Sequence, residues 1–132
     1  MRKILFRGKR TDRDEWAEGF YQEYPEGYAH IQTAYNDWFP VIPETVGQFT
    51  GMFDIRGNKI FEGDYLKLTE DVKETFDIHD GDVRYSRGGF YVGTYGDTLS
   101  SLGVIADYTG VARGIVIGNI HDNPELMTDK EK

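Results

Sequence analysis

The sequence contains no cysteine, which excludes disulfide bonds, thiolate metal sites and a cysteine nucleophile. It also has no apolar run of about 18 residues, so we expect no transmembrane helix. The apolar stretch 4–6 near the N-terminus is far too short for the core of a signal peptide. These absences predict a protein that is made and used in the cytoplasm, without membrane contact.

Positive charge is scarce, because 15 Lys and Arg face 23 Asp and Glu, for a net charge of −8. This balance argues against a phosphate-binding surface as the main function, so nucleic acid is not the expected partner. The charges are unevenly placed: six basic residues lie in 1–13 and six acidic residues in 69–82. The two segments could meet within or between subunits, and two separately solvated segments are the simpler interpretation.

Aromatic residues and glycine are plentiful. Aromatics make up 14% of the chain, which suits half-buried pleated sheets, and 16 Gly against 4 Pro indicates many tight turns. Period-two alternation of apolar residues predicts short strands. These strands cover residues 3–8, 16–22, 28–33, 64–68, 83–85, 90–94 and 115–120. The pattern predicts a mainly β fold, an all-β roll or small barrel with one or two short helices.

The segments between these strands carry turn and breaker signals. Residues 37–45 contain two prolines, which lack the N–H that a central ladder requires, so we expect a connecting loop there. Residues 49–61 form a predicted hairpin that turns at Gly57-Asn58. The acidic, aperiodic residues 67–82 predict a long loop. Residues 98–105 predict a short helix capped by Asp97, and 123–125 carry a helix-start signal.

No motif in the sequence indicates a catalytic reaction, and we expect neither catalytic residues nor a cofactor. The glycine-rich stretches 88–96 and 110–118 lack the pattern of a phosphate-binding loop, so they are interpreted as turns and close-packed strands. The best metal candidates are Asp77, His79, Asp80 and Asp82, which cluster within six residues. They do not match the calcium-loop pattern, and a solvated acidic loop is the default interpretation.

An ordered set of segments carries a family resemblance. The segments are ILFRGKR (4–10), WAEGFY (16–21), PETVGQFTGM (43–52), GNKIFEGDYLKL (57–68), GGFYV (88–92) and VIGNIHDNPELM (116–127). Together they resemble the YopX family of phage and prophage proteins, and the last segment is the most specific. The chain departs from the family pattern at residues 53–56, Phe-Asp-Ile-Arg, where the family more often carries a polar run leading into Asn-Gly, whereas here the order is Gly57-Asn58.

The resemblance implies a fold and an organisation but no activity, since it brings no established catalytic residues. It implies an N-terminal β-meander over residues 1–47 and an SH3-like barrel or roll over 48–127. A frayed tail over 128–132 would complete a single YopX-like domain spanning residues 1–132. The stretch 48–67 would join the two regions, and a tendency to self-assemble is implied as well.

These observations favour a non-enzymatic phage or prophage accessory protein. We expect a homo-oligomer that binds an unidentified host or phage protein. Its contact residues would be large aromatics in predicted loops, namely Trp38, Phe39, Tyr95 and Tyr108.

Three alternatives stay open. One is nucleic-acid binding through residues 1–13 and the hairpin that holds Arg84 and Arg87. Another is mimicry of DNA by the acidic segment 70–82, and the third is a metal-dependent enzyme that uses the acidic cluster described above.

Overall fold

The computed structural model describes residues 4–93 and 99–126. Contacts within the chain group it into two units, Met1–Phe49 and Thr50–Lys132. Strand β5, Gly47–Phe53, begins in the first unit and ends in the second. The stretch 48–67 therefore joins an N-terminal meander to a second β-rich unit, and a single functional domain stays a prediction.

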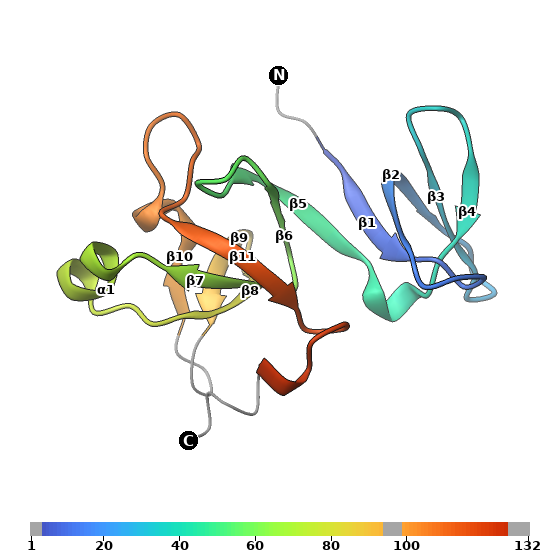
Figure 1. The fold of residues 1–132 in the computed structure, drawn as a ribbon. Helices are drawn as coiled ribbons and strands as arrows, with labels where there is room; N and C mark the ends of the chain where they lie inside the picture. Colours follow the sequence, from blue (N-terminus) through green and yellow to red (C-terminus); the bar gives the residue numbers. More distant parts are fainter. Residues whose placement is uncertain (1–3, 94–98, 127–132) are drawn as a thin grey trace. The chain divides into compact units, whose positions relative to one another are not determined.

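The first unit is an antiparallel meander in the order β4-β3-β2-β1, followed by the first residues of β5 (Figure 1). Its elements are β1 Phe6–Lys9, β2 Trp16–Glu23, β3 Ala29–Gln32, β4 Trp38–Pro40 and the short 3-10 helix Pro43–Thr45. The predicted loop over 37–45 is wrong where it includes β4. Pro40 fits there because β4 lies at the sheet edge, where no further strand needs the missing N–H.

One face of this meander holds the first unit's hydrophobic core. Ala17, Ala29, Ile31 and Val41 are buried there and pack with partly buried Phe6, Tyr21, Phe39 and Val46. Gly19 permits close packing of β2 and β3, since a Cβ on it would lie 1.9 Å from the carbonyl oxygen of Gln32. On the other face of the sheet, Glu18, Phe20 and Trp38 are exposed.

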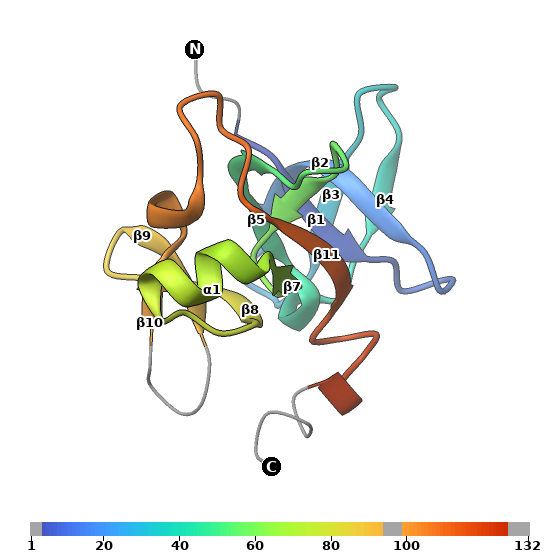
Figure 2. The ribbon, with the colours of Figure 1, turned by 60° about the vertical axis from the view of Figure 1, so that its left-hand side comes forward.

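The second unit contains the rest of β5, β6 and a five-stranded antiparallel sheet in the order β10-β9-β8-β7-β11. The elements that follow β5 share one hydrophobic core, and Figure 2 shows them from another side. They are β6 Lys59–Phe61, β7 Asp64–Leu68, α1 Glu70–Phe76, β8 Gly81–Ser86, β9 Gly89–Gly93, β10 Leu99–Ser101, the 3-10 helix Leu102–Ile105 and β11 Gly114–Asn119. The prediction of a mainly β fold is confirmed, but the strands of residues 4–93 and 99–126 form no closed barrel.

Two predicted connections differ from the structure. The loop expected over 67–82 contains helix α1, which is ordered because Val72 and the following Ile78 enter the core. The helix expected over 98–105 is instead strand β10 followed by a 3-10 turn, and its proposed cap Asp97 lies outside the described residues. Pairing of residues 99–101 with β9 outweighs the weak helix signal there.

The turn after β5 is organised by a buried carboxylate, that of Asp54. Its Oδ1 accepts the N–H groups of Arg56 and Asn58 at 2.9 and 2.8 Å. Its Oδ2 accepts the N–H of Val116 in β11 at 3.0 Å, and the Ile55 N–H donates to the Gly114 carbonyl at 3.1 Å. Because β11 is an edge strand, this turn pairs backbone groups that would otherwise be open to another chain.

None of the helices in the described part of the chain is long and apolar enough to span a membrane.

Candidate protein-binding surface

The solvent-facing side of strands β2, β3 and β4 presents a line of large side chains. Strand alternation sends Ala17 of β2 and Ile31 of β3 into the core and leaves their neighbours on the other face. In the register of the sheet, Phe20 lies opposite Gln32, and Gln32 lies opposite Trp38. These three residues, which we call the aromatic row, therefore cross three adjacent strands side by side.

The aromatic row is accessible and nearly free of charge. The exposed fraction is 67% for Phe20 and 50% for Trp38. Behind Trp38, the His30 ring meets its indole edge-on with centroids 6.4 Å apart, and Tyr24 meets His30 in the same way at 5.4 Å. These edge contacts restrict the orientation of the Trp38 ring before any partner binds.

The β1 side of the same face is basic, but its charges are already engaged. The Arg7 guanidinium lies 4.8 Å from the centre of the Trp16 ring, and Lys9 lies 2.5 Å from a carboxylate oxygen of Asp14. Arg10, which follows β1 and lies on the opposite face against Phe39, forms a two-point ion pair with Asp12. That hydrogen bond from Arg10 is the largest influence on Asp12 and lowers the pKa of its carboxyl group. Local neutralisation leaves little positive charge for phosphate groups.

The predicted contact residues fall in different places. Trp38 is exposed on the aromatic row, whereas Phe39 points to the opposite face, where the Arg10 guanidinium lies 3.9 Å from its ring centre. Tyr108 is fully exposed in a loop of the second unit, beside an Asp107 carboxylate that accepts N–H groups from Thr109 and Val111. Tyr95 lies outside the described residues.

The four metal candidates do not converge on one point. Asp80 accepts the N–H of Leu68 and bonds Lys73, while Asp82 forms a two-point pair with Arg84. Asp77 and His79 are exposed, with 4.0 Å between a carboxylate oxygen and Nε2. Within residues 4–93 and 99–126, no three His, Asp or Glu side chains are placed to hold a metal ion together.

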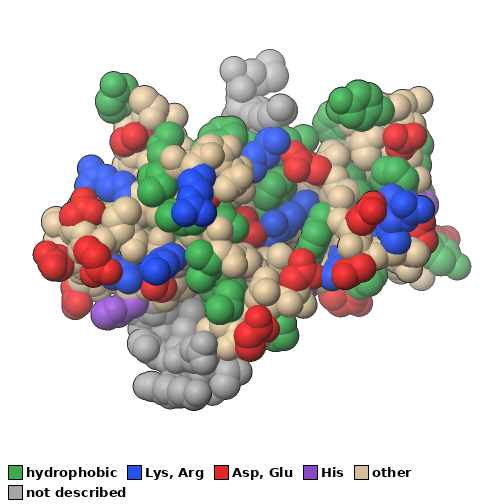
Figure 3. Space-filling model, viewed as in Figure 1, with side chains coloured by type: hydrophobic (Ala, Val, Ile, Leu, Met, Phe, Trp, Pro, Cys, Tyr) green, Lys and Arg blue, Asp and Glu red, His purple; other side chains and the backbone are tan. Residues whose placement is uncertain are grey.

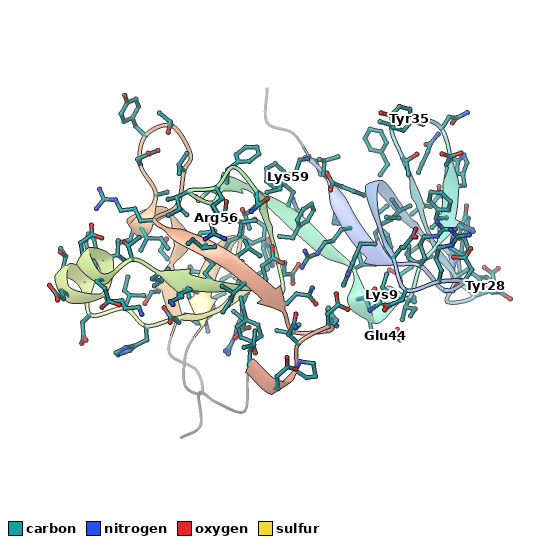
Figure 4. The ribbon with its side chains drawn as sticks, in the orientation of Figure 1. Lys9, Tyr28, Tyr35, Glu44, Arg56 and Lys59 are labelled. Atoms are coloured by element: carbon teal, nitrogen blue, oxygen red, sulfur yellow. The ribbon has the colours of Figure 1, made fainter. Side chains whose placement is uncertain are left out.

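Phe20 and Gln32 were missed as contact residues, although the alternation in β2 contains the signal. Trp16, Glu18 and Phe20 share one face of that strand, and a charged residue between two aromatics indicates that the face is solvated. The alignment of Phe20 with Trp38 depends on the register of three strands, which short-range patterns do not fix. Tyr28 and Tyr35 are also exposed, but Figure 4 places them at opposite ends of the unit.

Comparisons with known proteins agree with this fold and assign no activity. A family model described as YopX protein matches residues 5–128. A solved structure, the crystal structure of protein EF1440 from Enterococcus faecalis, is similar at a TM-score of 0.51 and 26% sequence identity. That match covers 95% of this chain and 98% of the other. No curated protein matches significantly. Since the family model spans nearly the whole chain, this protein belongs to the YopX family.

Proposed function

We propose that this YopX-family protein is a non-enzymatic, homo-oligomeric phage or prophage accessory protein of the bacterial host cytoplasm. It acts by binding a host or phage protein, and its contact surface is the aromatic row. The observation that carries this proposal is the register that aligns exposed Phe20 and Trp38 across Gln32. The SH3-like organisation of the second unit belongs to the same proposal.

The chemistry of the row suits a protein partner. Trp is enriched among residues that dominate binding energy, and large aromatics lose little conformational freedom when they become buried. The Nε2 of Gln32 donates to Asn36 Oδ1 at 2.5 Å, so its Oε1 is the acceptor that the row presents between two apolar groups to orient a partner. Exposed apolar side chains that lie side by side are typical of interaction surfaces.

The test is affinity capture of the tagged protein from infected or lysogenic host lysate, with nuclease in one set of washes. The variant Phe20→Ser with Trp38→Ala removes the row, and Tyr28→Ala is the matched control because it removes an equally exposed aromatic elsewhere in the unit. We expect a nuclease-resistant partner with the wild type and the control. Its affinity for the row variant should fall at least about 100-fold, as for two hot-spot residues.

Circular dichroism and thermal melts show whether the row variant stays folded. A folded row variant that retains the partner at full affinity would contradict the assigned surface. Recovery of only nuclease-sensitive material would indicate that the partner is a nucleic acid and not a protein.

A second candidate function is mimicry of DNA by α1. The helix presents exposed carboxylates at Glu70, Asp71, Glu74 and Asp77 where the sequence predicts only a loop. An ordered row of negative charge can compete with phosphates for a basic protein. Competition with duplex DNA for the captured partner, abolished by Glu70→Lys with Glu74→Lys, is the expected result of this alternative.

A further inference from the structure

The outer face of β7 and β11 in the second unit combines apolar and basic side chains. Val116 of β11 packs on the core, so the preceding Ile115 faces away from it. Ile117 lies at a register shift between Val116 and Gly118 and is 48% exposed. Lys67 of β7 lies directly opposite Ile115 in the sheet register. Blue and green side chains lie together over these strands in Figure 3.

Two further cations border this face. Arg113 directly precedes β11, and Arg56 lies in the turn that is bonded to Gly114 and Val116 through Ile55 and Asp54. Figure 4 shows Arg56 in front of β11, and both arginines are exposed. We call Arg56, Lys67, Arg113, Ile115 and Ile117 the basic-apolar patch.

The cations of the patch differ from others of the chain in how they are neutralised. Lys9, Lys73 and Arg84 each lie within 3.2 Å of a carboxylate oxygen. Among the residues that the structure describes, Arg56 and Lys67 form no ion pair. Arg113 reaches Asp71 at 3.5 Å, and both side chains are more than half exposed. In a protein of net charge −8, Arg56 and Lys67 therefore give the patch a positive potential that no ion pair with a described carboxylate cancels.

We propose that the basic-apolar patch binds an acidic, extended peptide segment of a partner protein that carries aliphatic side chains between its carboxylates. In an extended segment every second side chain faces the patch, so carboxylates and aliphatic groups that take turns at positions i, i+2 and i+4 would lie on the three cations and on Ile115 and Ile117. The segment lies on the sheet face rather than adding a strand along the start of β11. There the Gly114 carbonyl and the Val116 N–H are already bonded to the Asp54 turn.

The same features disfavour a nucleic acid. The patch offers no aromatic ring on which a base could stack, and three cations are few for a phosphate chain. Helix α1 begins two residues after β7 and carries exposed Glu70 and Glu74, which would repel a long polyanion that passed the patch. A short acidic segment meets less of that repulsion because it covers only the patch, where Asp71 at the start of α1 already lies 3.5 Å from Arg113.

Fluorescence polarisation with a synthetic probe tests the proposal on the full chain. The probe is a fluorescein-labelled peptide of about ten residues in which Glu and Val take turns at every second position, with Ser between them, so that both face the patch when the chain is extended. We expect saturable binding that weakens with salt. Lys67→Gln with Arg56→Gln should lower the affinity at least about tenfold, and Ile117→Ser several-fold, about as expected for lost charge and apolar contacts.

Matched variants separate this site from general charge and from the aromatic row. Arg87→Asn removes a cation from the β8–β9 turn at a position where φ is 49°, which asparagine tolerates, and it should leave the affinity within about twofold. The Phe20→Ser with Trp38→Ala variant should bind the probe normally, so this proposal and the proposed function can fail separately.

Four results would overturn the proposal. One is absence of saturable binding, and another is an equal loss of affinity in the Arg87→Asn variant. The third is tighter binding of an oligothymidine of matched charge, which would assign the patch to nucleic acid. Sedimentation of the wild type and the patch variant provides a further check. A loss of self-association only in the patch variant would identify a second copy of this chain as the occupant instead.

Discussion

At the scale of single residues, Asp54 links two distant segments through hydrogen bonds that the sequence pattern does not predict. One carboxylate oxygen holds the turn that follows β5, and the other reaches Val116, 62 residues further along the chain. Burial alone would raise the pKa of Asp54, but the hydrogen bonds from Val116, Asn58 and Arg56 outweigh it and lower the pKa. The charged form is therefore the one that the fold stabilises.

The variant Asp54→Asn tests this role, because an amide can replace only one of the two accepting oxygens. Its NH2 group would face the N–H of Val116 or of the turn, so a buried donor would stay unsatisfied. We expect a loss of about 2 kcal/mol in the free energy of unfolding, measured with urea at pH 7. The control is Asp107→Asn, which should change stability little, because Oδ1 of Asp107 accepts the Thr109 and Val111 N–H groups.

The same variant gives a test of pH dependence. The pKa of Asp54 lies below its ordinary value of 3.8 in the folded protein. Its contribution to stability is therefore fully present above about pH 4 and is lost as the pH falls through the folded-state pKa. The stability difference between wild type and Asp54→Asn should shrink as the pH is lowered from 7 to about 3. A difference that stays constant over this range would show that the carboxylate charge is not what matters.

At the scale of elements, α1 is an acidic helix held by very few core contacts. Val72 is its one buried residue, and Thr69 precedes the helix in an extended conformation. Asp77 ends the helix with φ of 53°, a left-handed conformation that aspartate adopts more readily than most residues. Because a helix of this length is marginal by itself, packing of Val72 decides whether it forms.

Replacing Val72 with alanine should therefore destabilise the protein by about 2 kcal/mol, the usual range for lost buried methyl groups. Thr75→Ala, at an exposed position of the same helix, should leave stability within about 0.5 kcal/mol of the wild type. Urea denaturation measures both. Equal stability of Val72→Ala and wild type would mean that the segment is the solvated loop that the sequence predicts.

At the scale of the whole molecule, the residues that the structure describes form two hydrophobic clusters. One cluster lies wholly within residues 1–49, and the other lies wholly within residues 50–132. Ile31 and Ile60 are fully buried in the first and the second cluster respectively. Each cluster can therefore be weakened without removing a contact from the other.

Hydrogen exchange followed by mass spectrometry tests the separation of the two clusters. Ile31→Ala should speed exchange in β2 and β3, and Ile60→Ala should speed it in β7 and β8, each by a loss of about 3 kcal/mol of local stability. Val104→Ala, at an exposed position, is the control. If either core variant accelerated exchange equally in both units, the chain would unfold as one cooperative body and the division would have no energetic meaning.

Local sequence patterns were sufficient to predict a strand or turn where its pairing strand lies next to it in the sequence. Strand β7 has the bounds that alternation predicts, and the β8–β9 hairpin turns at Arg87 and Gly88, which both have positive φ. The patterns failed where distant contacts compete with weak propensity. Strand β4 forms despite Pro40 because it pairs with the edge of β3, and α1 forms because Val72 packs into the core.

The candidate surfaces follow the same division. Alternation places Phe20 on one face of β2 with Trp16 and Glu18, and the predicted loop over 37–45 marks Trp38 as an aromatic that needs a reason for exposure. The row that they form with Gln32 requires the register of β2, β3 and β4. The basic-apolar patch gathers Arg56, Lys67 and Arg113 from three segments that no short motif connects.

The sequence by itself determined the class of the fold, the turns and the family, because each depends on residues near one another along the chain or on their order. Tertiary structure alone decided which side chains share a face, which carboxylate covers the edge of β11 and which cations stay unpaired. The physical reason is that sheet register and burial are set by contacts between distant segments. A change of one residue in register would turn every such side chain to the opposite face.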